Sequence, residues 1–173
     1  MAEQSDLQTQ FYADLQQCKE KMGKIVSSEC HYANAVLEEV FRFRHISESI
    51  MRQVESDMYI EGQFVPAGTL VQANFAAVHF NPDYFDEPGK FNPERFIDCK
   101  TGRFKKSQYV IPFSIGLREC PGKRIARLEV FDFASKLIDA FQITNNLHDV
   151  TPDEHYGLFM PKELKLCFTS RIR

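Results

Sequence analysis

The chain has 173 residues, of which 43% are hydrophobic and 26% are charged, a composition typical of globular proteins and not of disordered ones. The formal net charge is -3 and no long basic run occurs, which argues against nucleic acid as the main partner. The polar start, MAEQSDLQTQ, does not resemble a signal peptide, and no apolar run is long enough to span a bilayer. We therefore expect no membrane span in this chain.

The first predicted element is a helix, because apolar residues recur at helical spacing: Leu7, Phe11, Leu15, Cys18 and Met22. Ser5 and Gln8 are expected to form a capping box at its start, and Gly23 is expected to end it. A second amphipathic helix is predicted from about His31 to Arg44.

Hairpin strands are predicted in the next segment, MYIEGQFVPAGTLVQANF, where short β-branched runs are separated by Glu61-Gly62 and by residues 66–68. The following segment, HFNPDYFDEPGKFNPERF, has three prolines among aromatic residues, so neither helix nor strand is expected there. Its aromatic side chains indicate that this irregular segment is packed against the rest of the protein.

A long helix is predicted from about Lys123, with the apolar stripe Val130, Phe133, Ala134, Leu137, Ile138 and Phe141. The tail GLFMPKELKLCFTS alternates weakly and predicts one or two strands. Together these elements predict an α+β fold that is mostly helical.

The chain has five widely spaced cysteines, with neither a CxxC pair nor a zinc pattern: Cys18, Cys30, Cys99, Cys120 and Cys167. Their odd number favours a reducing compartment over a disulfide framework. Cys120 lies in PFSIGLRECPG, directly before the predicted helix from Lys123. The helix N-terminus and the nearby Arg118 favour a thiolate, which is either a nucleophile or a metal ligand. Without further residues, a buried structural cysteine is the commoner interpretation.

The residues around Cys120 match a longer pattern: Phe113-x-x-Gly116-x-Arg118-x-Cys120-x-Gly122-x-x-x-Ala126. This pattern resembles the heme-binding signature of the cytochrome P450 family. The resemblance implies that Cys120 is the axial ligand of the iron of heme b, where a thiolate favours O–O cleavage. The resemblance also implies that five further residues bind the cofactor. Phe113 would shield the porphyrin and Arg118 would pair with a propionate. The small residues Gly116, Gly122 and Ala126 would let the backbone approach the porphyrin closely.

Two further motifs resemble the same family. Glu39-Val40-Phe41-Arg42 looks like the ExxR pair of its K helix, and Pro93-Glu94-Arg95-Phe96 looks like its PERF segment. The resemblance implies a buried structural triad of Glu39, Arg42 and Arg95 that fixes the proline-rich segment to the second helix. An ExxR pair without the other motifs is more often a solvated surface pair, which contributes about 0–1 kcal/mol.

Smaller matches resemble the microsomal, drug- and steroid-oxidising branch of the family. Arg52 falls where that branch places a basic residue against the second propionate, so it joins the implied cofactor-binding set. His79 matches a histidine common in the family, although a loop histidine is an equal alternative, and His45 replaces the usual proline. Residues 46–51 and 156–159 correspond to segments that line the substrate pocket, and their apolar character suits a lipophilic substrate.

The resemblance implies that residues 1–173 form a single partial domain, the C-terminal third of the cytochrome P450 fold. This part contains the J and K helices, β hairpins, the proline-rich meander, the cysteine loop and the L helix, and it lacks the I helix and the N-terminal regions. The implied activity is that of a heme-thiolate monooxygenase, which puts one oxygen atom of O2 into a lipophilic substrate with electrons from NADPH-cytochrome P450 reductase. The full-length protein is expected at the endoplasmic reticulum membrane, and a chain without its anchor is expected in the cytoplasm.

Two other interpretations stay open at the level of sequence. The chain is a truncated, non-catalytic product with at most a heme-binding or interaction function, or it is a thiol-based redox or metal module. The second of these needs another cysteine or histidine beside Cys120, and none lies nearby in the sequence.

Overall fold

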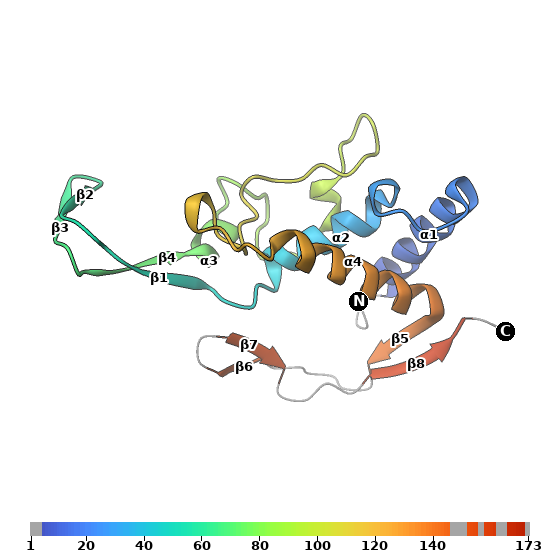
Figure 1. Ribbon diagram of the computed structural model, residues 1–173. Helices are drawn as coiled ribbons and strands as arrows, with labels where there is room; N and C mark the ends of the chain where they lie inside the picture. The colour runs from blue at the N-terminus through green and yellow to red at the C-terminus, as the bar shows by residue number, and fades with distance from the viewer. Residues whose placement is uncertain (1–4, 146–151, 156–157, 162–165, 172–173) are drawn as a thin grey trace.

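Three long helices make the body of the protein (Figure 1): α1 (Ser5–Met22), α2 (His31–Phe43) and α4 (Lys123–Ala140). The computed structural model describes residues 5–145, 152–155, 158–161 and 166–171. The α1 helix packs against α2, and α4 packs against both. Gly23 ends α1 as predicted, with a positive φ of 72° and an N–H that donates to the Lys19 carbonyl at 2.7 Å. Helices hold more of the described residues than strands do, which agrees with the predicted fold class.

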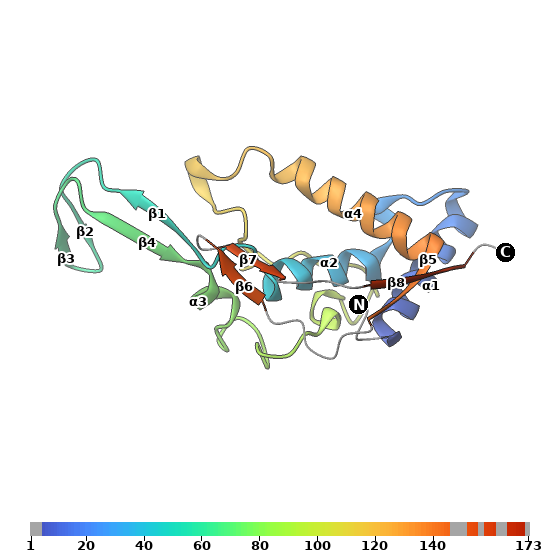
Figure 2. The same cartoon turned by 90° about the horizontal axis from the view of Figure 1, so that it is seen from below.

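A long β arm projects away from the helical body in both views (Figures 1 and 2). Strand β1 (Ser49–Gln53) pairs antiparallel with β4 (Leu70–Asn74), and the tip of the arm is the hairpin of β2 (Met58–Ile60) and β3 (Gln63–Val65). Both residues of the two-residue turn, Glu61 and Gly62, have positive φ, which is the geometry that a tight hairpin requires. The predicted hairpin is confirmed.

A short helix and a long irregular segment follow the arm. The helix α3 (Phe75–His79) was not predicted, and Asn74 caps it by accepting the Ala77 N–H at 3.0 Å. Residues 80–92 contain neither helix nor strand, as the prolines predicted. The prediction is wrong at the two ends of the segment, because His79 is the last residue of α3 and Pro93–Phe96 form a 3-10 turn. The described residues contain the 3-10 turns η1 (Ser27–Glu29), η2 (Pro93–Phe96) and η3 (Gly116–Arg118).

The C-terminal part adds two antiparallel strand pairs. Strand β5 (Phe141–Asn145) pairs with β8 (Leu166–Ser170), and β6 (Pro152–His155) pairs with β7 (Leu158–Pro161). The two tail strands, β7 and β8, agree with the prediction, whereas their partners β5 and β6 were not predicted.

The main core lies between the three long helices and β5, and it consists of Phe11, Leu15, Cys18, Cys30, Ala33, Val36, Leu37, Phe131, Ile138 and Ile143. The stripe predicted for α4 is partly wrong. Ile138 is buried, but Val130 and Phe133 are 36% and 68% exposed, and Phe131 is buried instead. Apolar residues occur on more than one face of α4, so helical spacing alone did not identify the face that contacts α1 and α2.

The predicted capping box at the start of α1 is also wrong. Gln8 is buried, and its side-chain amide bonds to the backbone of Ile143 in β5. Nε2 donates to the Ile143 carbonyl at 2.8 Å, while Oε1 accepts the Ile143 N–H at 2.7 Å. The amide therefore joins the first helix to the C-terminal sheet, because two buried backbone groups need a partner there.

Replacement of Gln8 tests this connection. Gln8→Leu keeps a similar volume but leaves both backbone groups of Ile143 unpaired, so we expect it to lower the free energy of unfolding by about 1–3 kcal/mol. Urea denaturation followed by circular dichroism measures the loss. The exposed Gln10→Leu is the matched control, with an expected change within about 0.5 kcal/mol. Equal effects of the two replacements would contradict the role of Gln8.

Candidate functional site

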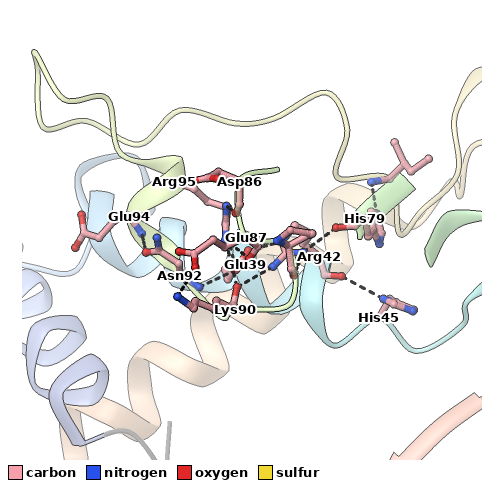
Figure 3. Close-up of polar contacts among 12 residues, drawn as sticks. Glu39, Arg42, His45, His79, Asp86, Glu87, Lys90, Asn92, Glu94 and Arg95 are labelled. Carbon is pink, nitrogen blue, oxygen red and sulfur yellow. Dashed lines mark hydrogen bonds and ion pairs between the residues drawn. The ribbon is translucent and has the colours of Figure 1, made fainter. Parts of the chain in front are cut away.

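The guanidinium of Arg42 is the centre of a buried polar network (Figure 3). Its side chain is fully buried, and each of its five N–H donors has an acceptor. Nε and Nη2 donate to the two carboxylate oxygens of Glu39 at 2.7 and 2.8 Å. The other donors reach the backbone carbonyls of His79, Pro88 and Lys90 at 2.7–3.2 Å. Arg42 thus ties α2 to α3 and to the proline-rich segment.

Arg95 joins this network, as the motif resemblance implied. Its Nε donates to Glu39 Oε1 at 3.3 Å, and Nη1 donates to the Asp86 carbonyl at 2.7 Å. The same Oε1 of Glu39 accepts the backbone N–H of Asn92 at 2.8 Å. The Arg95 side chain is 10% exposed. Glu39 therefore holds two arginines and one backbone group, and the irregular segment of residues 80–96 is fixed by charge as well as by aromatic packing.

His79 connects the network to the segment that precedes Cys120. Its backbone carbonyl accepts from Arg42, and its ring Nε2 accepts the N–H of Ile111 at 2.9 Å. The imidazole is fully buried and lies 5.4 Å from the ring of His45. Burial, followed by the charges of His45 and Arg42, lowers the pKa of His79 to about 4. His79 is therefore a neutral structural acceptor, and not a loop histidine.

The loop after Ile111 holds Cys120 in a fixed turn. The Ser114 N–H donates to the Ile111 carbonyl at 3.1 Å, and the Cys120 N–H donates to the Phe113 carbonyl at 2.9 Å. Ser114 and Gly116 have φ of 63° and 74°, and a left-handed non-glycine residue such as Ser114 costs about 1–3 kcal/mol. Backbone strain of this kind concentrates at functional sites, where the surrounding contacts maintain it.

The thiol of Cys120 is exposed and faces an open cavity of about 620 Å³. Segments far apart in the sequence meet around it. Its wall contains Phe113, Arg118 and Cys120 from the loop, Arg52 from β1, and also Ser47, Ser49, Ile50, Phe75, Pro112, Ser114, Leu117, Glu119 and Pro121. Four residues that the sequence singled out for cofactor binding are therefore brought together, and two of them supply positive charge.

The three small residues of the motif do not line this cavity. Gly116 is in the left-handed conformation that glycine favours. Gly122 is the N-cap of α4 with a φ of -81°, and a Cβ there would lie 3.8 Å from the sulfur of Cys120. Ala126 lies in the first turn of α4, and its N–H donates to the Gly122 carbonyl. These residues shape the loop and the helix start behind the thiol.

The sequence analysis missed one ion pair beneath the loop. Arg127 of α4 donates to Oε2 of the buried Glu38 at 2.6 Å, and its guanidinium lies over the rings of Phe41 and Phe113. Two consecutive glutamates next to the apolar residues of α2 were the available signal. Only Glu39 belongs to the ExxR motif, and the motif does not single out Glu38. The pair fastens α4 to α2 directly behind Phe113.

Of the two segments expected to line a substrate pocket, residues 46–51 and 156–159, the structure describes the side chains of the first. Ser47, Ser49 and Ile50 line the cavity, whereas Ile46 and Met51 are exposed. The side chains of residues 156–159 are not among those that the structure describes, so this part of the prediction is not tested. Over the described ranges, no helix is long and apolar enough to cross a membrane, and no cluster of three histidine, cysteine or acidic residues could hold a metal ion. Cys18, Cys30, Cys99 and Cys120 are not in disulfides.

Comparison with known proteins gives a consistent result. The model of the family "Cytochrome P450" matches residues 1–168. The chain is 34% identical over 145 residues to rat cytochrome P450 2B2. The matched region covers 81% of this chain and 29% of the rat protein. It is 40% identical over 111 residues to rat cytochrome P450 2J3, and 35% identical over 145 residues to human cytochrome P450 2A7. The matches cover 22–29% of these three relatives, so the chain spans less than a third of their length.

Loss of the central guanidinium should unfold much of the protein. Arg42→Met leaves Glu39 buried without its main partner, so we expect a loss of about 3–5 kcal/mol in the free energy of unfolding. Urea denaturation measures it. The control is Lys136→Met, which removes an exposed pair with Asp132 and should cost less than about 1 kcal/mol. A similar small loss for Arg42→Met would contradict the buried network.

The pH dependence of the free energy of unfolding should reveal that the buried His79 ring is neutral in the folded protein. Its folded pKa of about 4 is below the ordinary value of 6.5, so the unfolded chain binds more protons as the pH falls. The full contribution is present above about pH 6.5 and is lost as the pH falls towards 4. His79→Gln keeps an acceptor for the Ile111 N–H but does not titrate, so its urea midpoint should fall less than that of the wild type between pH 7 and 5. Parallel pH profiles would contradict a neutral buried His79.

Proposed function

Because the chain belongs to the cytochrome P450 family, we propose that it is the C-terminal, heme-binding portion of a heme-thiolate monooxygenase. Residues 1–173 form one partial domain of that fold, and Cys120 is the axial ligand of the heme iron. The observation that carries the proposal is the cavity of about 620 Å³, because an exposed thiol and two arginines from distant segments share its wall.

The chemistry of the wall fits heme. Heme needs one strong axial ligand from the protein, and the exposed Cys120 thiol supplies it without help from a second metal ligand. Cys120 lies two residues before Gly122, the N-cap of α4, so the thiol is close to the positive end of that helix. The Gly122 position keeps the space 3.8 Å from the sulfur free of a side chain.

The charged and aromatic side chains of the cavity wall fit the propionates and the porphyrin face of heme. The two propionates of heme are anionic, and Arg52 of β1 and Arg118 of the loop offer one guanidinium for each. Phe113 would contact the porphyrin face beside the thiolate. The ring of Phe113 has its own support, since it meets Phe41 edge-on at 5.5 Å and lies against the Arg127 guanidinium.

When bound, heme supplies the iron at which O2 is activated, and the residues of this chain hold and orient it. Cys120 would hold the iron and donate electron density to it. Glu39, Arg42 and Arg95 touch neither cofactor nor substrate, and they keep the segments around the loop in place. The overall reaction is the transfer of one oxygen atom from O2 to a lipophilic substrate, with electrons from NADPH-cytochrome P450 reductase. The full-length protein acts at the endoplasmic reticulum membrane.

A second function follows from the length of the chain. It spans less than a third of the length of its relatives, so activity of these 173 residues by themselves does not follow from the family. A reactive site needs to exclude water. The alternative is a non-catalytic product that binds heme through Cys120, or serves in an interaction, and does not turn over substrate.

Reconstitution with hemin tests the heme site in both cases. The reduced, CO-bound wild-type chain should show the red-shifted Soret band of thiolate ligation, and Cys120→Ser should lose it with its far-UV circular dichroism unchanged. Cys99→Ser replaces another exposed thiol outside the cavity and should keep the band. A wild-type chain without this band, or a Cys120→Ser variant that retains it, would refute the proposed ligand. Turnover with reductase and a panel of lipophilic substrates then separates the two functions.

A further inference from the structure

Two buried thiols, Cys18 and Cys30, meet at the junction of α1 and α2, away from the heme cavity. Cys18 is 3% exposed and Cys30 is fully buried, and both are free. Their sulfur atoms converge on one carbonyl, since the Sγ of Cys18 and of Cys30 lie 3.6 and 3.3 Å from the oxygen of Val26. Both side chains belong to the same buried core cluster. They are therefore a pair of buried thiols gathered around one carbonyl between two helices.

The two sulfur atoms have different surroundings. The backbone N–H of Val26 donates to Cys18 Sγ at 3.2 Å, and this sulfur also lies 3.6 Å from the carbonyl oxygen of Lys24. The pKa of the Cys30 thiol is raised to about 12, first by burial and then by its contact with Cys18 and the charge of Asp14. Cys30, buried and protonated, is therefore slow to react with an oxidant on its own, and Cys18, which lines a cleft, is the thiol suited to react first.

Cys18 has a route to solvent, because it lines a cleft of about 280 Å³ between α1, the start of α2 and the segment near Glu94. Cys30 does not line this cleft. The wall is polar, with Lys21 and His31 on the side of the two helices. None of its residues lines the cavity of Cys120. A small polar oxidant can therefore reach Cys18 without entering the heme site.

We propose that Cys18 and Cys30 are a redox pair that hydrogen peroxide converts to a disulfide. The sulfur of Cys18 attacks one peroxide oxygen, the O–O bond breaks, and Cys18 becomes a sulfenic acid with release of one water. The sulfur of Cys30 then attacks Cys18 Sγ, the S–O bond breaks, and the second water leaves with the thiol proton. Two thiols lose two electrons and two protons, and one peroxide becomes two waters.

The disulfide would join α1 covalently to the residue before α2, the helix that carries Glu39 and Arg42. A metal ion is a poorer explanation of the pair. Asp14, whose charge acts on Cys30, already accepts the Ala33 N–H at 2.9 Å, and the described residues contain no cluster that could hold a metal ion. The proposal does not depend on heme binding.

Peptide mapping of the 173-residue chain tests the pair. Trypsin releases Cys18 in residues 1–19 and Cys30 in residues 25–42, and neither peptide contains another cysteine. After brief treatment of the folded protein with hydrogen peroxide, non-reducing mass spectrometry should find the two peptides joined, two hydrogen masses below their sum. Dithiothreitol should separate them. The joined pair should be at least tenfold more abundant than in protein oxidised in urea.

A single replacement checks the order of the steps. With Cys30→Ser the sulfenic acid of Cys18 has no resolving thiol, so dimedone should label residues 1–19 after peroxide, and no joined peptide should form. Cys167→Ser removes an exposed thiol and should leave the joined peptide unchanged. The proposal is overturned if folded wild-type protein gives no more joined peptide than protein oxidised in urea while Cys99 and Cys167 are oxidised.

Discussion

The ion pair between Glu39 and Arg42 is the interaction on which the rest of the structure depends. It is fully buried, so its stability relies on the complete set of hydrogen bonds around it. Those bonds reach carbonyls in α3 and in the proline-rich segment, and Arg95 adds a second cation. The helix α2 thereby holds in place the short helix α3 and the proline-rich segment, which has little secondary structure of its own. Through His79 and Ile111, the same network reaches the loop of Cys120.

The placement of Cys120 follows from this arrangement. The loop has little helix or strand of its own, and it holds strained backbone at Ser114. Ile111 anchors its start through His79, and α4 anchors its end through the pair of Arg127 with Glu38. Between these two anchors the thiol stays exposed to the cavity that also receives Arg52. A ligand position that is exposed yet fixed at both ends is what an axial cysteine requires.

The sequence predicted the features that short spacing determines. Helical periodicity located α1, α2 and α4, the turn residues located the hairpin, and the motif resemblance predicted the contacts among Glu39, Arg42 and Arg95. It did not predict contacts that depend on long-range packing. The side chain of Gln8 bonds to the backbone of β5 and does not cap its own helix. The buried face of α4 includes Phe131 in place of Phe133. Glu38 pairs with a residue 89 positions away, which local pattern cannot reveal.

Hydrogen exchange in a His79→Ala variant tests most directly whether the buried network positions the cysteine loop. The replacement removes the ring acceptor of the Ile111 N–H but keeps the backbone carbonyl that Arg42 uses. The account predicts that the amides of Ile111 and of residues 113–120 exchange at least tenfold faster than in the wild type, while those in the second half of α2 keep their protection. Unchanged protection of residues 113–120 in this variant would contradict it.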